Sequence, residues 1–437
     1  MSKRTIHALT LLAAVLALAV AGCGSSSDSG GDSSSAVNED VSGDVSISGV
    51  WTGEEAKSFQ AVLDAFGEQY PNVSTSYDPA GNELPTVLST AVKGGNPPDL
   101  AAIPQPGLIG EFVDQGELQP LDFAEDTIRE NFADGVVNVS TFDDKVYGVL
   151  FKAANKSTVW YNVPLYETAG VEPPATFDEF VSNAETLRAS GTKPYSFGAD
   201  AGWPLTDLFE NIYLRQAGPE MYDQLATHEI PWTDQSVKDA LTTMGKVIGN
   251  SDNLVGGTSG AAQTDFPTSV NNAFKEGPEG ATVIEGDFVA GEIAASTPAK
   301  PLTDYDVFDF PSIDGSEPAV VGGGDTIVMF TDSPASEALV SYLATPEAAE
   351  IWAAIGGFSS ANQNLDTSVY SDELTQKTAS ALAEADTFRF DMSDLAPAGF
   401  GATVGKGEWQ ILTDFLQNPD DVDGTATALE QEANKAF

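Results

Sequence analysis

The chain has 437 residues, with 66 acidic against 19 basic side chains and a formal net charge of −47 at pH 7. This negative field excludes nucleic acid and anionic lipid headgroups as partners, and it favours a neutral or cationic ligand. One cysteine and two histidines exclude a disulfide framework and a thiolate or histidine-rich metal site, and we expect no metal and no cofactor.

Residues 1–22 predict a signal peptide, because two basic residues precede an apolar run too short to span a bilayer comfortably. The sequence Val-Ala-Gly-Cys at 20–23 resembles a bacterial lipobox, in which cleavage leaves the cysteine as the lipid-bearing N-terminus. We therefore expect Cys23 to carry lipid and to anchor the protein on the outer face of the cell membrane. The alternative is an ordinary buried cysteine beside a plain signal peptide. Residues 23–43 are small and polar, which predicts a flexible tether.

The next part of the chain alternates between strand and helix patterns, beginning with an expected strand at 45–50. Thr52 and Glu55 have the spacing of a capping box, and apolar residues follow at helical intervals. The pattern continues with a strand at 73–77, a helix at 83–93 and a strand at 99–103. Two successive βαβ turns predict a parallel sheet with helices outside it.

The rest of the chain repeats this alternation, with a second capping box at Thr176 and Glu179. Three glycines at 322–324 are expected to divide the residues 319–330 into two strands. The other expected strands are 146–151, 157–161, 195–198, 281–285 and 305–310. The expected helices are 176–189, 203–216, 234–248, two helices that start at Ser333 and Thr345, and then 372–386, 408–416 and 425–436.

Six segments, taken in order, carry a resemblance to a known family. They are WTGEEAKSF (51–59), GGNPPDLAAIPQPG (94–107), VYGVLFKAANKSTVWYN (146–162), GWPLTDLFE (202–210), GGGDT (322–326) and GGFSSAN (356–362). With the lipobox, this ordered set resembles the extracellular solute-binding proteins of ABC importers. Within that family it is similar to the carbohydrate branch (family 1 type), close to α-glucoside- and maltose-type binding lipoproteins. The resemblance runs from about residue 45 to 437.

The resemblance implies an α/β, two-lobe, periplasmic-binding-protein-like fold of type II, with lobes joined by a multi-strand hinge. The chain would cross between the lobes near 153–157, 308–311 and 356–360, and the lobes would close on a ligand by hinge motion. The implied domains are lobe one, 45–153 plus 309–357, and lobe two, 154–308 plus 358–437.

A sugar presents C–H patches, which aromatic rings cover, and hydroxyl groups, which carboxylates, amides and ammonium groups bind. In open parallel sheets the ligand lies beyond the carboxyl ends of the strands, so residues that directly follow strands are favoured. Together with the resemblance, this reasoning predicts a ligand site made of Trp51, Glu54, Gln105, Lys152, Asn155, Trp203, Asp207, Asp287, Phe288, Asp325, Phe358 and Trp409.

Several of these residues have alternative explanations. Trp51 could pack on the helix that follows it, and Trp203 could belong to a core. Lys152, Asn155 and Lys156, at the first crossing, could form a solvated hinge. By their spacing, Trp160, Trp352, Tyr161 and Tyr213 are expected in the core, while Arg389 and Asp391 are expected to pair with each other or to line the rim of the site.

The resemblance implies a monomeric, non-catalytic lipoprotein that captures an extracellular sugar and delivers it to the transmembrane permease subunits of an ABC importer. An α-glucoside or maltose-type oligosaccharide is the expected sugar. A secreted glycoside hydrolase is a second reading, since Asp207, Asp287 and Asp325 could supply the two carboxyls, about 5–9 Å apart, that such an enzyme needs. A third reading keeps the fold but binds a polyamine in a cage of carboxylates and aromatic rings. The hinged layout favours trapping over turnover.

Overall fold

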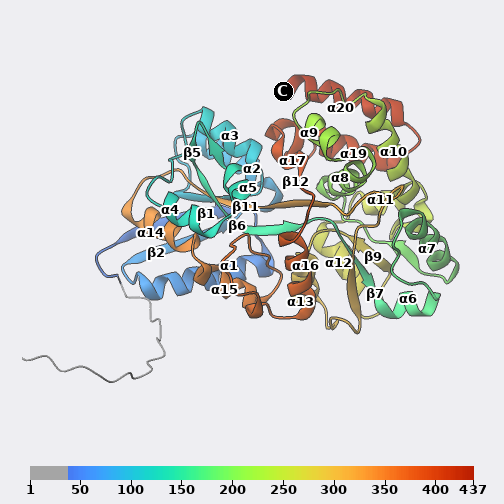
Figure 1. Cartoon of the computed structure of the whole chain (residues 1–437), viewed down its shortest axis with the longest axis horizontal. Coiled ribbons are helices and arrows are strands. Elements are labelled where there is room, and N and C mark those ends of the chain that lie inside the picture. Colours follow the sequence, from blue (N-terminus) through green and yellow to red (C-terminus); the bar gives the residue numbers. More distant parts are fainter. Residues whose placement is uncertain (1–37) are drawn as a thin grey trace, which may run out of the picture. The chain divides into compact units, whose positions relative to one another are not determined.

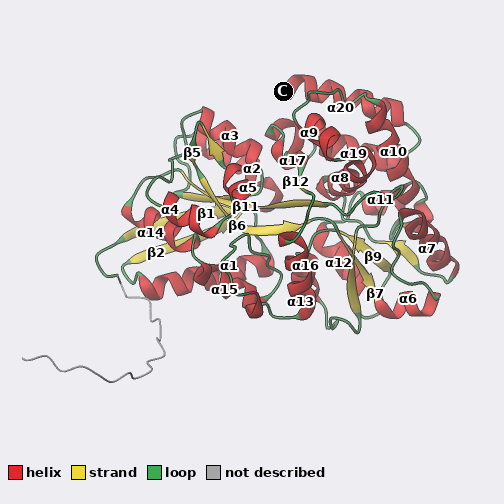
Figure 2. Ribbon diagram, in the orientation of Figure 1, coloured by secondary structure: helices red, strands yellow, loops and turns green. Residues whose placement is uncertain are grey.

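The computed structural model describes residues 38–437 (Figures 1 and 2). The expected signal peptide at 1–22, the expected lipidation site Cys23 and the expected tether up to residue 37 lie outside the described residues. Within the described part, helices and strands alternate along the chain and build an α/β fold around two main sheets.

The first sheet joins six strands: β1 (Gly43–Gly49), β2 (Val73–Pro79), β3 (Leu100–Ile103), β6 (Gly148–Asn155), β11 (Val320–Met329) and β12 (Phe388–Phe390). Their order is β12-β11-β3-β1-β2, and β6 also pairs with β11. β1 runs parallel to both β2 and β3, which confirms the parallel sheet expected from the two βαβ turns. β11 runs antiparallel to β3 and to β6.

The second sheet has four strands in the order β10-β7-β9-β8. They are β7 (Thr158–Asn162), β8 (Lys193–Tyr195), β9 (Gly280–Ile284) and β10 (Tyr305–Asp309). β7 is antiparallel to both β9 and β10, whereas β8 and β9 are parallel. A separate hairpin consists of β4 (Thr141–Phe142) and β5 (Lys145–Val146).

Helices flank both sheets in Figure 2. They are α1 (Gly53–Gln69), α2 (Leu84–Lys93), α3 (Pro106–Asp114), α4 (Glu125–Asn131), α5 (Asp134–Asn138), α6 (Val163–Ala169), α7 (Phe177–Ala189), α8 (Trp203–Ala217), α9 (Pro219–Ala226), α10 (Gln235–Ile248), α11 (Gly257–Ala261), α12 (Phe266–Phe274), α13 (Val289–Ser296), α14 (Pro334–Leu343), α15 (Pro346–Ile355), α16 (Glu373–Ala383), α17 (Met392–Leu395), α18 (Ala398–Gly401), α19 (Gly407–Gln417) and α20 (Val422–Ala436). The long amphipathic helices were predicted from their spacing, whereas short helices such as α5 and α17 were not.

Two residues, Lys156 and Ser157, connect the sheets, because β6 belongs to the first sheet and β7 to the second. The backbone N–H of Lys156 donates to the carbonyl of Val321 at 2.9 Å. The Ser157 hydroxyl accepts a hydrogen bond from the Val321 N–H at 2.8 Å and donates to Asn211 at 2.5 Å. This connection is therefore fastened to both β11 and α8. The residue limits of the two lobes stay a prediction.

The glycines at 322–324 lie inside β11 and do not divide it, so the expectation of two strands was wrong. A Cβ atom at Gly322 would lie 2.2 Å from the ring of Phe388 on the neighbouring β12. Glycine is thus required here for the close approach of another strand, and not for a turn. The pairing with β6 shifts between Asp325 and Thr326, where a bulge takes up the irregularity.

One of the two predicted capping boxes is confirmed. The Thr176 hydroxyl accepts from the backbone N–H of Glu179, and the Glu179 carboxylate accepts from the backbone N–H of Thr176. Thr52 begins α1 without a side-chain cap hydrogen bond, so the first predicted box was wrong. Glu55 instead reaches Lys152.

These two threonines form a matched pair for a stability measurement. We expect Thr176→Ala to lower the free energy of unfolding by about 1 kcal/mol, because the backbone N–H of Glu179 at the start of α7 loses the hydroxyl that accepts its hydrogen bond. Thr52→Ala should change it by much less, since no cap hydrogen bond is lost. Urea unfolding of both variants measures the difference, and equal losses would contradict the assignment.

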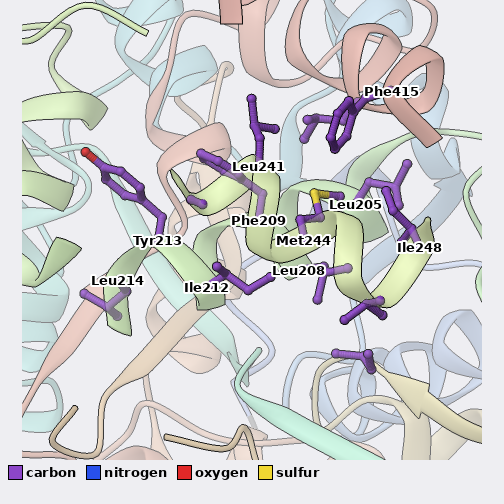
Figure 3. Close-up of a cluster of buried hydrophobic side chains, with 14 of the residues drawn as sticks. Leu205, Leu208, Phe209, Ile212, Tyr213, Leu214, Leu241, Met244, Ile248 and Phe415 are labelled. Carbon is purple, nitrogen blue, oxygen red and sulfur yellow. The ribbon is translucent and has the colours of Figure 1, made fainter. Parts of the chain in front are cut away.

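The largest core surrounds α8 and α10 (Figure 3). Leu208 and Ile212 of α8 cluster there with Leu241 and Met244 of α10, and Phe415 joins them from α19. All five side chains are almost completely buried. The core placement predicted for four aromatic residues is also confirmed: Trp160, Tyr161, Tyr213 and Trp352.

Candidate functional site

A nearly buried ammonium group lies where the chain passes from the first sheet to the second. Lys156 is 12% exposed, and its Nζ lies 2.5 Å from Asp391 Oδ2 and 3.3 Å from both Asp207 Oδ1 and Asp394 Oδ2. Asp207 belongs to α8, Asp391 caps α17, and Asp394 lies within α17. Three carboxyl groups from two separate parts of the chain therefore converge on one lysine.

Asp391 and Lys156 form the charged pair of this cluster. Burial acts to lower the pKa of Lys156, but the carboxyls of Asp207, Asp391 and Asp394 outweigh burial and raise the pKa well above its usual value. Burial acts to raise the pKa of Asp391, yet the Lys156 ammonium and a hydrogen bond from Ser393 hold the pKa well below its ordinary value. Asp391 is thus the carboxylate that balances Lys156.

The remaining carboxyls around Lys156 favour their protonated forms. Burial raises the pKa of Asp207 and of Asp394 well above the ordinary value, and it raises the pKa of Glu285 to about 8. Burial, and then the charge of Asp391, raise the pKa of Glu408 in the same direction. These acids therefore keep their protons to a higher pH than exposed carboxyls do.

Buried polar atoms without a hydrogen-bond partner gather around this cluster. Most buried polar groups in folded proteins have a partner, and leaving one unpaired costs about 1–3 kcal/mol. Trp232 Nε1 and the Tyr195 hydroxyl are isolated atoms of this kind inside the α8 core, but a group of them marks a place where another molecule can supply hydrogen bonds. Among the described residues, the group comprises Gln105 Oε1, Asp207 Oδ2, both carboxyl oxygens of Glu285 and of Glu408, and Trp409 Nε1, on side chains that are 5% exposed or less.

The chain positions these residues from several elements. Gln105 is the N-cap of α3, which contacts α17, and Glu285 directly follows β9. Glu408 and Trp409 lie in the first turn of α19. A Cβ atom at Gly202 would lie 2.7 Å from the Cβ of Trp409, so Trp409 packs against the start of α8. The predicted residues Gln105, Asp207 and Trp409 therefore belong to one region.

A second lysine, Lys152, links two other residues of the predicted site, Asp325 and Trp51, with Glu55 of α1. Its Nζ lies 3.0 Å from Glu55 Oε1 and 4.0 Å from Asp325 Oδ2, and Asp325 accepts a hydrogen bond from Trp51 Nε1 at 2.6 Å. Burial acts to lower the pKa of Lys152, but Glu55 and Asp325 raise it above its usual value. Lys152 of β6 is thereby tied to α1 and to β11.

The rings of Trp51 and Phe358 lie in a core of the first sheet. Trp51 is 1% exposed and packs between Phe59 and Trp352, with ring centroids 4.7 and 5.0 Å away. Phe358 stacks on Trp352 at 5.3 Å. Glu54 is exposed and forms an ion pair with its helix neighbour Lys57. The structure thus surrounds both predicted rings with the protein's own side chains and places Glu54 at the surface.

Asn155 and Asp287 fasten neighbouring segments to each other. The Asn155 carbonyl accepts from the Asp287 N–H at 3.0 Å, and its side-chain oxygen accepts from the Ser157 N–H at 3.0 Å. The Asp287 carboxylate accepts a hydrogen bond from the Ser359 hydroxyl at 2.5 Å. These bonds join the segments 155–157, 287 and 359, two of which lie at predicted crossings, so both side chains hold the predicted hinge region.

Three half-buried aromatic rings lie together beside these groups. The ring centroids of Trp203 and Phe288 are 6.0 Å apart, and Phe266 lies 5.4 and 5.3 Å from them. Lys152 Nζ lies 5.5 Å from the Phe288 centroid. The predicted pair of Trp203 and Phe288 is therefore brought together, and Phe266 is an addition that no spacing signal in the sequence indicated.

The carboxyl cluster also contains residues absent from the predicted site. Glu408 directly precedes the predicted residue Trp409. Glu285 directly follows a strand and lies two residues before the predicted residue Asp287, so the rule that favours residues after strands could have found it. Lys156 was placed at the first predicted crossing but not in the predicted site, and Asp394 gave no separate signal. The expectation for Asp391 changes as well, because Arg389 pairs with Asp223 and Asp391 pairs with Lys156.

The described residues contain no helix that is both long enough and apolar enough to cross a membrane. They also contain no cluster of three or more histidine, cysteine, aspartate or glutamate side chains arranged to hold a metal ion.

Sequence comparisons find a family and close relatives. The family model described as "Bacterial extracellular solute-binding protein" matches residues 51–350. The osmoprotective compounds-binding protein GgtB of Synechocystis is 33% identical over 385 residues, covering 86% of this chain and 89% of the relative. The alpha-glucosides-binding periplasmic protein AglE of Rhizobium meliloti is 32% identical over 403 residues, covering 87% and 85%.

Solved structures share the fold at lower sequence identity. The bacterial solute receptor AcbH, described as having a preference for β-D-galactopyranose, matches with a TM-score of 0.79 at 20% identity, covering 90% of this chain and 98% of that one. The GacH receptor of Streptomyces glaucescens, solved with and without acarbose, matches with a TM-score of 0.70 at 17% identity, covering 91% and 100%. These likenesses confirm the two-lobe type II fold.

Proposed function

The chain belongs to the bacterial extracellular solute-binding proteins, and from that premise we propose that it captures a sugar outside the cell for an ABC importer. The proposed ligand is an α-glucoside or a maltose-type oligosaccharide, in keeping with the name of the relative AglE. The observation that carries the proposal is the group of buried, unpartnered polar atoms from Gln105 to Trp409, close to half-buried aromatic rings.

A sugar can supply the hydrogen-bond partners that the buried polar atoms of this region lack. Its hydroxyl groups can donate to the unpartnered oxygens of Asp207, Glu285 and Glu408, and can accept from Trp409 Nε1. Its ring faces are apolar and suit the half-buried rings of Trp203 and Phe288. The support for a sugar is therefore the combination of acceptors, one donor and aromatic faces.

We propose that the protein binds and does not catalyse. Two of the three carboxyls considered for hydrolysis are already hydrogen-bonded within the protein. Asp287 accepts from the Ser359 hydroxyl, and Asp325 accepts from Trp51 Nε1 and lies near Lys152. Asp207 contacts Lys156. Capture needs only that the closed form bind the sugar more tightly than the open form, so that the ligand shifts the equilibrium toward closure.

Anchoring and delivery complete the proposal. Cys23 is proposed to carry lipid and to hold a monomer outside the cell membrane, where it presents bound sugar to the transmembrane subunits of the permease. The lobes are proposed to comprise 45–153 plus 309–357 and 154–308 plus 358–437. The short connection at Lys156 and Ser157, and the bonds among Asn155, Asp287 and Ser359, support a hinge at their junction.

Titration of tryptophan fluorescence with maltose, trehalose, other α-glucosides, galactose and spermidine tests this function. We expect a saturable change with at least one α-glucoside, at a lower concentration than any change with spermidine. Prolonged incubation with maltose or a nitrophenyl glucoside should give no product. Sustained hydrolysis in excess of the protein, or failure of every sugar to bind, would overturn the proposal.

Trp409 offers a sharper test of the site. We expect Trp409→Phe to weaken sugar binding by about tenfold, because the variant keeps a ring but removes an indole N–H that would otherwise bond the ligand. Trp232→Phe is the matched control, since Trp232 Nε1 is also unpartnered but packs against Phe209 and Phe400 in the core. Equal effects of the two variants on the affinity would contradict the role of Trp409.

A further inference from the structure

The unpartnered atoms near Lys156 are nearly all acceptors. Six of them are oxygens, on Gln105, Asp207, Glu285 and Glu408, whereas Trp409 Nε1 is the one donor in the group found among the described residues. A hydroxyl group donates a single hydrogen and is itself an acceptor, while an ammonium group donates three and accepts none. The hydrogen-bonding inventory of this site therefore suits an ammonium group better than a hydroxyl group.

The charges of the cluster also favour an ammonium group. Lys156 contacts the carboxyls of Asp207, Asp391 and Asp394, and the charges of this group also act on Glu285 and Glu408. Five acids thus share one nearby cation. Burying carboxylates without a counter-charge costs several kcal/mol each. The free site avoids this cost by keeping protons on its acids, and a second cation would allow them to ionise.

One further acid, Glu210, faces the cluster, but both of its carboxyl oxygens already accept hydrogen bonds. Its carboxyl oxygens accept from the Tyr222 hydroxyl and from the backbone N–H groups of Met392 and Ser393. Glu408 has no partner on either oxygen although it is fully buried, and the buried carboxyl of Glu285 has only the Asp207 carboxyl as a side-chain partner. These two glutamates, with the free oxygen of Asp207, are the acids available to a ligand.

We propose that the captured sugar carries a protonated amino group, which binds among Asp207, Glu285 and Glu408. This inference rests on the proposed function and narrows its ligand to an aminated sugar. The ammonium group donates to the three carboxyls, and the half-buried rings of Trp203 and Phe288 cover the sugar ring. The strong negative charge of the chain, −47, attracts such a ligand over long distances.

Proton release follows from this arrangement. A bound ammonium stabilises ionised carboxyls, so protons held by acids of the free site pass to solvent when the ligand enters. Because burial raises the pKa of Glu285 to about 8 in the free protein, affinity for an amino sugar should rise from about pH 5.5 to about pH 7.5. Affinity for a neutral sugar should not rise over that interval.

Calorimetric titration with matched sugars tests the inference. The probes are maltose and trehalose, each beside its 2-amino-2-deoxy derivative and the N-acetylated form of that derivative. We expect the amino sugar of at least one pair to bind about tenfold or more tightly than its neutral parent, and acetylation to abolish the gain. Titration of the wild-type protein in two buffers of different ionisation enthalpy should show proton release with the amino sugar alone.

Isosteric variants locate the effect. Glu285→Gln and Glu408→Gln should each lower affinity for the amino sugar by about tenfold or more while changing that for the parent sugar by less than about threefold. Glu279→Gln is the control, because Glu279 is exposed and pairs with Lys275 on the surface. An equal loss in the control would assign the preference to the long-range field and overturn the inference.

The outcomes separate this inference from the proposed function. If neutral sugars bind and their amino counterparts bind equally or more weakly in every pair, the amino-group assignment is overturned and the capture of sugar stands. If neither member of any pair binds, the amino-group assignment is overturned, and the fluorescence titration with the wider panel of sugars decides whether the capture of sugar stands. The proton-release measurement needs no variant, so it decides the assignment even if a substituted protein fails to fold.

Discussion

Lys156→Met is expected to lower the free energy of unfolding by about 3–5 kcal/mol at pH 7, because it leaves buried acids without their nearby cation. Lys156 contacts Asp207, Asp391 and Asp394, and it is the main opposite charge that keeps the pKa of Asp391 below its ordinary value. Methionine keeps an unbranched apolar side chain of similar length, so the loss reports mainly the charge. Urea unfolding measures it.

The pH dependence of this loss gives a second readout. A carboxyl whose pKa is raised on folding keeps a proton that the unfolded chain releases, so its contribution to stability is present at low pH and declines as pH rises. Glu285, with its pKa raised to about 8, should therefore make the wild-type protein less stable as pH rises from about 4.5 to about 8. Without Lys156, the pKa of Asp391 also rises, and the variant should lose stability more steeply.

The difference between wild type and Lys156→Met should thus be smallest near pH 4 and grow toward pH 8. Lys275→Met is the matched control, because Lys275 forms an exposed pair with Glu279 and surface pairs contribute about 0–1 kcal/mol. A difference that does not vary with pH, or a loss no larger than that of the control, would contradict the electrostatic role assigned to Lys156.

The elements that the sequence predicted well are those specified by local patterns. The spacing of apolar residues located α8 and α10, and the two βαβ turns gave the parallel pairing of β1 with β2 and β3. The error at Gly322 has a non-local cause, since its neighbour is the ring of Phe388 from β12. Glycine usually indicates a turn. Only the packing of the distant strand β12 shows that Gly322 lies within a strand.

The candidate site shows the same division between local and non-local information. Gln105, Asp207 and Trp409 were predicted because they lie at the end of a strand or the start of a helix, at places where the family that the sequence resembles contacts its ligand. Lys156 and Glu408 act through their neighbours, which come from elements far apart in the chain. Burial also decides whether the face of an aromatic ring is available to a ligand. Trp51 is fully buried, whereas Trp203 is only half-buried. Such distinctions need the tertiary structure.

The second large effect is expected from Gly107→Ala, which should weaken sugar binding by about 100-fold. A Cβ atom at Gly107 would lie 2.0 Å from the carbonyl oxygen of Ala396 and 2.8 Å from that of Leu395. Overpacking of this kind costs about 3 kcal/mol, which corresponds to a factor of about 100 in an equilibrium constant. Because both neighbours are backbone atoms, helix α3 itself has to move away from the end of α17.

That movement affects the site because α3 carries Gln105 at its N-cap and α17 carries Asp394. A hydrogen bond from the Ala398 N–H to Glu111 Oε1, at 2.9 Å, holds the same two segments together. If the proposed hinge lets these segments separate, the strain is relieved by opening and not by unfolding. The variant should then keep its melting temperature within about 3 °C of the wild type while its affinity falls.

Gly399→Ala is the control, because Gly399 is exposed in α18 and its added Cβ would meet no atom within 4 Å. Fluorescence titration and thermal unfolding of both variants separate the two possible consequences of the clash. Wild-type affinity in Gly107→Ala would mean that the contact between α3 and α17 does not contribute to binding. A large fall in melting temperature with unchanged affinity of the folded protein would mean that the contact supports the fold and that the segments cannot part.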